Sequence, residues 1–597
     1  DSAAGAGAGR DAQEYFERTG ERSRWTNSIF GGMPTYQMAP SYDSTKSLSW
    51  VEKTYQLYLP EYVVLTFIMM LGFYILLRAF GISAWLAGFG GIIWAFSSYF
   101  FILIPAGHIW KFVTLAYIPP TIAGIVLAYR RKYLLGGIIT ALFIALQIRS
   151  NHIQMSYYFM FVILFIIGAY FEEAYKKKEL THFFKASAIL ALAAMVGVCI
   201  NLSNLYHTYE YSKETMRGKS ELKQEGNAAN QTSSGLDRDY ITNWSYGIGE
   251  TLTLLVPNVK GGASSDNLSQ SEAAMEKANP MYSSIYSQFP QYFGDQPWTA
   301  GPVYVGAFVM FLFVLGCFIV KGPLKWALLG ATIFSVLLSW GKNFMGLTDF
   351  FIDYVPMYNK FRAVSSILVI AEFTIPLLAI FALKEILGRP EILKLKENRT
   401  GVIVSLVLTA GVSLVLAVAP SVFFSSFVTA QEMAALQQGL PAEHLTPVVT
   451  NLTEMRKAII ASDAWRSFFI IAVGCFLLFL FLQKRLKASF TLVGIVLLCL
   501  VDMWCVNKRY LYDEQFVPKS KRTEAFVKTQ ADEIILRDTA PDYRVLNFVG
   551  FPSNTFNENN TAYWHKSVGG YHAAKLRRYQ EMIDHHIMPE TVSYTHL

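Results

Sequence analysis

Charged residues are scarce in this chain of 597 residues: they make up 16% of it, against about 25% in a typical globular domain. Cysteine is scarce too, and the five cysteines fall within or at the edge of apolar stretches without the spacing of a metal site. The motifs of nucleotide-binding loops, serine-hydrolase elbows, zinc-protease helices and paired thiols are absent from the sequence. These absences argue against a water-soluble class, a disulfide framework and soluble-type nucleotide hydrolysis.

The two ends of the sequence also lack expected features. No initiator Met and no signal peptide opens the chain, because Asp1 leads directly into polar sequence. We therefore expect a chain truncated at both ends, with one further membrane-spanning helix before Asp1. The last residues, TVSYTHL (591–597), look like translated sequencing-adapter read-through and are left out of the fold prediction.

Long apolar stretches, in contrast, are abundant. Hydrophobic residues make up 53% of the chain and the mean hydropathy is +0.31. A bilayer needs roughly 17–25 apolar residues per helix. By this measure we predict spans near 61–80, 84–105, 112–129, 133–149, 154–173, 183–203, 302–320, 323–341, 364–386, 400–422, 465–483 and 487–506. The predicted fold class is an all-α polytopic membrane protein with about 12 transmembrane helices, extracytoplasmic loops and the start of a C-terminal α/β outer domain.

The placement of Lys and Arg predicts the orientation of the helices. One set of short loops carries roughly 17 of these residues and the alternating set roughly 7, which places the first set in the cytoplasm. Most of the net charge of +7 lies in these loops, so no nucleic-acid partner is needed to explain it. The predicted order is a first outer loop, a first helix group, a large outer loop, a second helix group and a partial outer domain, at 1–60, 61–203, 204–301, 302–506 and 507–590. Residues 342–363 and 423–464 are predicted as further outer loops.

The C-terminal region changes character. FVPKSKRTEAFVKTQ predicts a helix, DYRVLNFVG a strand, and HKSVGGYHAAKLRRYQ a glycine turn that leads into a basic helix. This mixture is the reason for expecting an α/β-type domain after residue 507.

Polar residues gather where four of the predicted spans meet water on one side. His108, Lys111, Arg149, Asn151 and His152 form this group. Arginine offers bidentate contacts to phosphate and histidine adds hydrogen bonds, so the group predicts a site for an anionic headgroup. The alternative is that these side chains only cap helix ends and extend to the interface. Metal binding by the two histidines is a weaker alternative.

A second group lies in LTDFFIDYVPMYNKFR. Asp349 and Asp353 are four residues apart and share a helical face, which allows them to bind a divalent cation. Lys360 and Arg362 follow as a second cationic anchor, and Pro356 indicates a re-entrant or interfacial segment. The alternative for the two acids is a solvated amphipathic turn.

Two further features lie inside predicted spans. Glu372 and Asp502 are carboxylates within or at the edge of apolar helices, where burial is costly unless the charge is paired. Asp502 can also lie at an ordinary interfacial position. Pro119 and Pro120 interrupt the hydrogen bonding of the third span, which predicts either a discontinuous helix or a kink.

Six short sequence motifs, in this order along the chain, resemble those of the YfhO family of bacterial membrane proteins. The resemblance runs from about residue 5 to about residue 590. They are RWTNSIFGGMPTYQ, AGHIWKF, SNHIQMSYYF, WSYGIGETLTLLVPNVKGG, YNKFRAVSSILVIAEF and HKSVGGYHAAKLRRYQ. The family is similar to the C-type (GT-C fold) glycosyltransferase superfamily, whose members use polyprenyl-phosphate-linked sugars on the outer face of the membrane. The resemblance implies a multi-pass protein of the bacterial cytoplasmic (inner) membrane.

The resemblance also implies a catalytic or metal-binding carboxylate in the first outer loop. Asp1 stands at about that place, with Asp11, Glu14 and Asp43 as alternatives in the same loop. A divalent cation, Mg or Mn, is the cofactor that such a site would take. The implied partners are the lipid bilayer, a polyprenyl-phosphate-sugar donor and an envelope glycan or lipid acceptor.

The predicted function is therefore sugar transfer from a polyprenyl-phosphate donor to a cell-envelope glycan or lipid on the extracytoplasmic side. Arg149, Lys111 or Arg362 would bind the donor phosphate, and a loop carboxylate would deprotonate the acceptor hydroxyl or hold the cation. The alternatives are a lipid or glycolipid transporter or flippase, which predicts paired charges near the bilayer midplane, and a non-catalytic envelope assembly factor.

Overall fold

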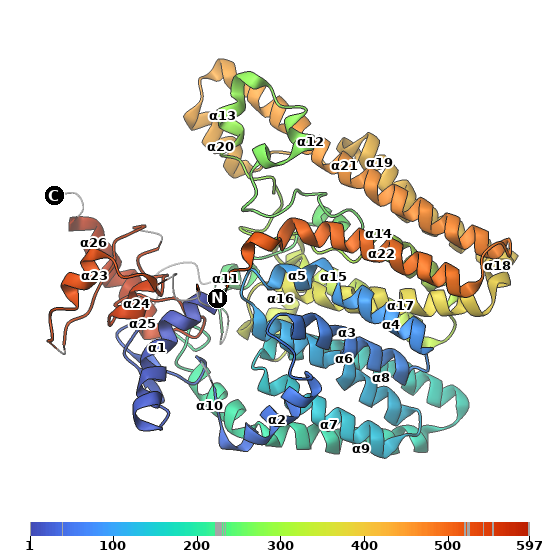
Figure 1. Cartoon of the computed structure of the whole chain (residues 1–597), viewed down its shortest axis with the longest axis horizontal. Coiled ribbons are helices and arrows are strands. Elements are labelled where there is room, and N and C mark those ends of the chain that lie inside the picture. The colour runs from blue at the N-terminus through green and yellow to red at the C-terminus, as the bar shows by residue number, and fades with distance from the viewer. Residues whose placement is uncertain are drawn as a thin grey trace.

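The protein is almost entirely helical. The computed structural model describes residues 2–38, 40–220, 230, 232, 235–518, 521, 526–540, 542–551 and 554–594. Within these residues, regular sheet is limited to two antiparallel strands of two residues each, β1 (Trp25–Thr26) and β2 (Met33–Pro34). The helices form a layered bundle with the N-terminal and C-terminal segments gathered at one end of it (Figure 1).

The apolar helices follow the predicted spans. They are α3 (Val63–Ala79), α4 (Ala84–Ala95), α5 (Ser98–Leu103), α6 (Ile109–Tyr129), α7 (Tyr133–Arg149), α8 (Ile153–Lys177), α9 (Leu180–Ile200), α14 (Ala307–Ile319), α15 (Pro323–Ser339), α17 (Val369–Gly388), α18 (Lys396–Leu406), α19 (Val412–Val418), α21 (Ala442–Leu482) and α22 (Ala488–Tyr510). In the described part of the chain, seven helices or helix pairs are long and apolar enough to cross a membrane, and an eighth span exists if α15 and the bent segment after it are counted together. Four more apolar helices are shorter. This is compatible with an all-α membrane protein; the number twelve stays a prediction.

Helices α6 and α17 lie in the middle of the bundle and are buried on nearly all sides. Helix α6 continues through Pro119 and Pro120 without a break, so the discontinuous helix considered from the sequence does not form. The close packing of α3 against α6 relies on Gly72, where an added Cβ would lie 2.6 Å from the carbonyl oxygen of Ala116. That carbonyl is one of those left without its helical donor by the two prolines.

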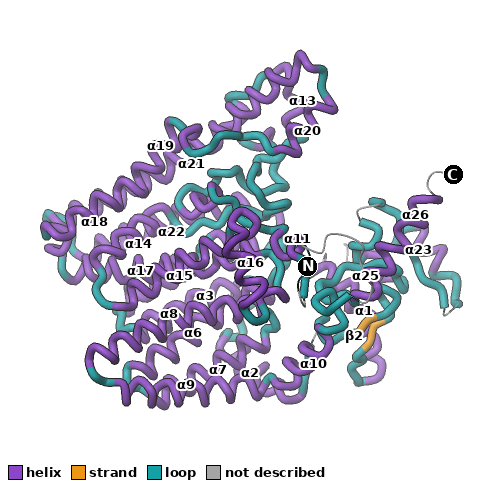
Figure 2. The backbone as a smooth tube through the Cα atoms, turned by 180° about the vertical axis from the view of Figure 1, so that it is seen from behind, coloured by secondary structure: helices purple, strands orange, loops and turns teal. Residues whose placement is uncertain are grey.

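Helix α15 and the segment Gly341–Tyr354, which contains α16 (Met345–Tyr354), meet at a bend of 108°. This bend is compatible with the predicted re-entrant or interfacial segment, which stays a prediction. Helix α16 lies at the end of α15 that is nearer the N-terminus and the C-terminus of the chain (Figure 2).

Helix α21 is longer than predicted. It spans 41 residues and begins at Ala442, within the region predicted as an outer loop at 423–464. The polar half stays helical because Val448, Leu452, Met455 and Ile459 form an apolar stripe on it. This stripe packs with the short helices α12 (Glu272–Met275), α13 (Ser283–Tyr286) and α20 (Ala430–Gly439) into a projecting arm (Figure 1).

The N-terminal and C-terminal segments pack together at one end of the bundle. The helices of these segments are α1 (Ser2–Thr19), α2 (Lys46–Tyr55), α23 (Gln530–Ile535), α24 (Asn560–Trp564), α25 (Arg577–Met582) and α26 (Met588–Tyr594). Two helices from the middle of the chain, α10 (Leu202–Ser212) and α11 (Arg238–Thr242), lie at the same end of the bundle. The Phe30 amide donates to the Gly569 carbonyl (3.0 Å) and the Ser567 amide donates to the Ser28 carbonyl (2.9 Å). Segments more than 500 residues apart in sequence therefore form one cap.

The predicted α/β character of the C-terminal region is wrong in one respect. In the described residues after 507, the strand predicted at DYRVLNFVG is reduced to an isolated bridge between Val545 and Ser567. The basic helix predicted after the glycines is confirmed as α25. Part of the helix predicted at FVPKSKRTEAFVKTQ lies outside the described residues.

Candidate functional site

A cavity of about 1360 Å³ lies between the ends of the membrane helices and the cap. Its wall combines the turn between α7 and α8, one face of α10, the loop after α10, residues 357–361 and the C-terminal residues 572–581. The lining contains eight Lys or Arg side chains and three carboxylates. The cations are Arg22, Arg149, Lys213, Arg217, Lys219, Lys360, Arg577 and Arg578, and the acids are Glu52, Glu214 and Glu581. Such an excess of positive charge favours an anionic ligand.

The turn between α7 and α8 brings three of the predicted site residues to this cavity. Arg149 ends α7, Asn151 has a φ of +60°, and His152 precedes the first residue of α8. Asparagine tolerates this left-handed conformation better than most residues, which allows a tight turn. The Asn151 amide donates to Gln37 Oε1 (3.2 Å), and Asn204 donates to Asn151 Oδ1 (3.2 Å), so the turn is connected to the N-terminal segment and to α10.

Arg149 is held by a partner that the sequence analysis did not identify. Its guanidinium is ion-paired with Glu52 and donates to Ser49 Oγ (2.7 Å). Glu52 also accepts a hydrogen bond from the Tyr117 hydroxyl (2.9 Å). Arg149 therefore reaches the cavity with one carboxylate already beside it.

On the opposite wall of the cavity, the side chains of Arg217, Lys360 and Arg577 lie near one another. Residues 214–216 pair with residues 575–577 through backbone hydrogen bonds, which place Arg217 and Arg577 on the same wall. Arg217 donates to the carbonyls of Lys360 (3.1 Å) and Ala573 (2.8 Å), and Lys360 Nζ donates to the Arg217 carbonyl (2.9 Å).

Burial and neighbouring like charges lower the pKa of two cations on this wall. Burial and the charges of Arg217, Arg577 and Lys219 hold the pKa of Lys360 below its ordinary value. Burial also lowers the pKa of Arg217. The buried Nε of Arg577 makes no hydrogen bond within the described part of the chain. Buried donors are usually paired, so an anion in the cavity would satisfy this group and reduce the repulsion.

Two imidazoles complete the lining. Burial, together with the charges of Lys111 and His108, lowers the pKa of His152 to about 3, and burial lowers the pKa of His572 to about 4. Both are therefore neutral at physiological pH. Nδ1 of His152 is buried and makes no hydrogen bond to any described residue. A neutral imidazole can donate or accept one hydrogen bond toward a ligand.

The other predicted headgroup residues do not line the cavity. Lys111 is buried in α6, where Nζ donates to Ser366 Oγ (3.1 Å). Arg362 donates to the Tyr240 hydroxyl (2.8 Å), and its carbonyl accepts from Gln154, a lining residue. His108 is exposed immediately before α6.

The two aspartates predicted to bind a metal ion are paired with an arginine instead. Asp349 and Asp353 share one face of α16, as expected, and both are ion-paired with Arg238, at 2.5 and 2.7 Å. Among the described residues, no group of three or more His, Cys, Asp or Glu side chains has the arrangement of a metal site. A divalent cation therefore stays a prediction, and Arg238 accounts for the charge of the two acids.

Asp1, the predicted catalytic residue, lies outside the described residues. Of its alternatives, Asp11 accepts hydrogen bonds from the Thr26 hydroxyl and the Asn27 amide (both 3.2 Å). Glu14 is paired with Arg10, and Asp43 is paired with Lys46. None of these three lines the cavity.

The buried carboxylates of the bundle are bonded within the protein. Glu372 accepts a hydrogen bond from the Ser97 hydroxyl (2.5 Å), and its other oxygen has no partner among the described residues. Asp502 is ion-paired with Arg466 and accepts from the Tyr304 hydroxyl (2.7 Å). Neither lines the cavity, so they are not part of this site.

Sequence reasoning missed Glu52, Arg217, Arg577 and Arg578 as site residues. The basic run KLRRYQ, which contains Arg577 and Arg578, was the signal in the sequence. It predicts a basic helix, but nothing in the sequence indicates that this helix lies beside the ends of the apolar helices. Comparison of the chain with protein-family models, with curated proteins and with solved structures finds no match. The resemblance to the YfhO family therefore stays a prediction, and the function rests on the geometry of the cavity.

Proposed function

We propose that this chain is a membrane-embedded glycosyltransferase-like protein that binds a polyprenyl-phosphate-linked sugar in the 1360 Å³ cavity. The observation that carries this proposal is the excess of eight cationic side chains over three carboxylates at the ends of apolar helices. Arg217, Arg577 and Lys360 would bind the phosphate, because guanidinium and ammonium groups provide charge-assisted hydrogen bonds to its oxygens.

The lining also suits a lipid-linked donor. Trp110, Ile153, Leu205, Met357 and Phe361 contribute apolar surface to the cavity near the helix ends. An isoprenoid tail would leave the cavity along this surface toward the bilayer, while the sugar would face the polar cap. Asn151, His152 and His572 would donate or accept hydrogen bonds to sugar hydroxyls.

A carboxylate is needed to accept the proton of the attacking hydroxyl. Family resemblance assigns this role to Asp1. Among the described lining residues, Glu214 is exposed and has no ion pair, whereas Glu52 is paired with Arg149 and Glu581 lies beside Arg577. Glu214 is therefore the second candidate for the base, and transfer would release the polyprenyl phosphate.

The test uses the purified chain in nanodiscs with polyprenyl phosphate and with a polyprenyl-phosphate sugar. We expect Arg217→Gln and Arg577→Gln each to weaken binding of the lipid phosphate by about tenfold, the equivalent of one charge-assisted hydrogen bond. Lys277→Gln, a change of an exposed cation on the arm, is the control and should bind like the wild type. Equal binding by all four proteins, or no transfer to any acceptor fraction of a bacterial envelope, would contradict the proposal.

A lipid transporter is the second candidate, and one observation favours it. Lys111 and Glu372 are both buried in the central helices α6 and α17, and buried membrane charges commonly mark transport paths. This function predicts movement of a fluorescent polyprenyl phosphate between the leaflets of proteoliposomes. It would be excluded if the movement equals that in protein-free vesicles while sugar transfer is retained.

A further inference from the structure

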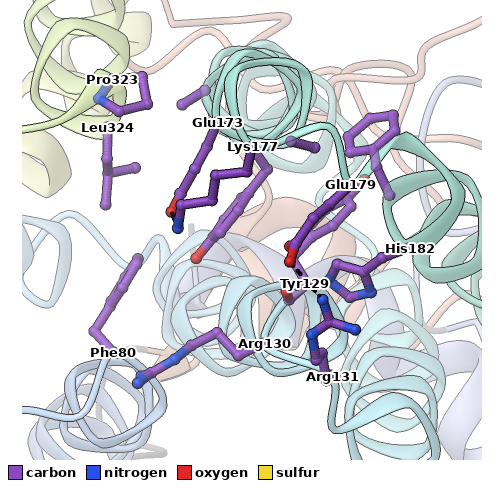
Figure 3. Close-up of a pocket in the computed structure, with 14 residues that line it drawn as sticks. Phe80, Tyr129, Arg130, Arg131, Glu173, Lys177, Glu179, His182, Pro323 and Leu324 are labelled. Atoms are coloured by element: carbon purple, nitrogen blue, oxygen red, sulfur yellow. Dashed lines mark hydrogen bonds and ion pairs between the residues drawn. The ribbon is translucent and has the colours of Figure 1, made fainter.

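A second, smaller cavity lies at the other end of the same helices. It encloses about 410 Å³ between the C-terminal ends of α3, α6 and α8 and the N-terminal ends of α9 and α15 (Figure 3). Helix α8 separates it from the large cavity by about 35 Å, at 1.5 Å per residue. In a membrane this cavity would therefore lie at the opposite surface.

Arg130 is fixed at the edge of this cavity by the end of α3. It follows the last residue of α6, and Nη1 donates to the Ala79 carbonyl (2.5 Å). Gly81 gives the guanidinium its space: φ is +77°, and an added Cβ would lie 3.2 Å from Nη1. The Arg130 side chain is exposed and pairs with no carboxylate of the described residues. Its remaining N–H donors are thus open to a ligand.

The other charged groups of the cavity are already matched. Arg131 pairs with Glu179 (2.9 Å) and Lys177 pairs with Glu173 (2.5 Å). Both ring nitrogens of His182 already have protein partners, because Nε2 lies 2.8 Å from the Tyr129 carbonyl oxygen and Nδ1 lies 2.6 Å from the Tyr133 hydroxyl. Arg130 therefore carries the positive charge that is left over.

One side of the cavity is apolar. Phe80, Pro323 and Leu324 line it, and Figure 3 shows them on the side away from Arg131, Glu179 and His182, with the Arg130 side chain extending toward Phe80. Trp85 and Trp326 begin α4 and α15 at this same end of the bundle and are 86% and 61% exposed. Exposed tryptophans of this kind are typical of the membrane–water interface, so the cavity lies at headgroup level.

We propose that this cavity binds the phosphate diester of an anionic phospholipid. Arg130 donates hydrogen bonds to the phosphate oxygens, and the acyl chains leave the cavity along Phe80 and Leu324. The flanking turns Arg130–Lys132 and Lys176–Lys178 make the surface basic, which favours an anionic lipid over a zwitterionic one. A free phosphate ion shares the chemistry of the headgroup but does not use the apolar wall.

The test titrates the full chain in detergent with phosphatidylglycerol and counts bound lipids by native mass spectrometry. We expect one tight site that prefers phosphatidylglycerol over phosphatidylcholine. Arg130→Gln should weaken that site by at least about fivefold, because a charge-assisted bidentate contact is lost. Lys132→Gln removes a cation from the same turn without touching the cavity, and should change the affinity less than twofold.

Four outcomes would overturn the inference. Equal affinity for the two lipids would show that the site does not discriminate between headgroup charges. Equal loss of affinity in Arg130→Gln and Lys132→Gln would show only a general attraction of the lipid to the basic surface. Displacement of the lipid by millimolar inorganic phosphate would assign the cavity to a soluble anion. If Arg130→Gln does not fold, Leu324→Trp fills the apolar side instead; unchanged lipid binding in that variant would also contradict the proposal.

Discussion

At the scale of single residues, burial decides the protonation state of the cavity histidines. His152 and His572 lie among cations, with Lys111 and His108 acting on the first and Arg217 on the second. A positive imidazolium there would lose hydration and meet like charges. The neutral forms are consequently favoured, and the cavity keeps its anion-binding cations without adding two titrating charges near neutral pH.

This protonation state predicts an acid-sensitive fold. The folded pKa values of about 3 and about 4 lie below the ordinary 6.5, so the unfolded chain binds more protons between pH 6.5 and about 4. The resulting stabilisation is complete above pH 6.5 and is lost as the pH falls through that window. Thermal unfolding should therefore shift downward between pH 7 and pH 5.

The double variant His152→Gln, His572→Gln provides the comparison. It lacks both groups and should show a shallower loss of melting temperature over the same pH range. His586→Gln, a change of an exposed histidine in the C-terminal segment, is the control and should keep the wild-type slope. If the double variant and the wild type lose stability in parallel, these histidines are not the source of the acid sensitivity.

At the scale of elements, the bundle depends on the close approach of α3 to α6. Helix α6 carries two internal prolines and is buried along almost its whole length. Gly72 on α3 leaves room for the Ala116 carbonyl, which lacks its helical hydrogen-bond donor because residue 120 is a proline. A glycine inside a membrane helix is costly in chain entropy, and here the contact with α6 offsets that cost.

We expect Gly72→Ala to destabilise the protein by about 1–3 kcal/mol, because overpacking forces the two helices apart. Gly88→Ala is a matched control, since an added Cβ at Gly88 in α4 meets nothing within 4 Å. That control should leave stability unchanged or raise it slightly, since Ala has the higher helix propensity. Denaturation of both variants in the same detergent measures the difference; the idea fails if Gly72→Ala is as stable as Gly88→Ala.

At the scale of the whole molecule, polar chemistry is divided between the two ends of the bundle. The large cavity and the cap occupy one end, and the basic turns with the smaller cavity occupy the other. The distribution of Lys and Arg in the sequence predicts that the basic turns face the cytoplasm. Under this prediction the large cavity opens on the extracytoplasmic side, which is the side that the proposed function requires.

Single cysteines test this arrangement. In a chain whose five native cysteines are replaced, Lys219→Cys at the large cavity should react with a membrane-impermeant maleimide in intact cells. Lys132→Cys at the opposite end should react only after permeabilisation. Both positions are exposed side chains, so accessibility to the reagent depends on the side of the membrane. Labelling of both from outside would contradict the orientation.

Much of the helical architecture follows from the sequence, since each predicted span overlaps an apolar helix. The site follows only in part. Arg149, Asn151 and His152 reach the cavity because they occupy one tight turn between two apolar helices, a local pattern. Lys111 in the first turn of α6 and Arg362 in the loop before α17 were expected at the same site, yet neither lines the cavity. Residue spacing does not reveal which side chains are covered by neighbouring elements.

The sequence by itself determined that this chain contains long apolar helices with polar, cation-rich ends, because hydrophobic length and charge are properties of consecutive residues. Only the tertiary structure decided that Arg217 and Arg577 share one wall, that Glu52 stands beside Arg149, and that Arg238 occupies the two acids of α16. Those contacts join residues that are far apart in the chain, and they depend on how whole helices pack. The segments from both ends meet in the cap for the same reason.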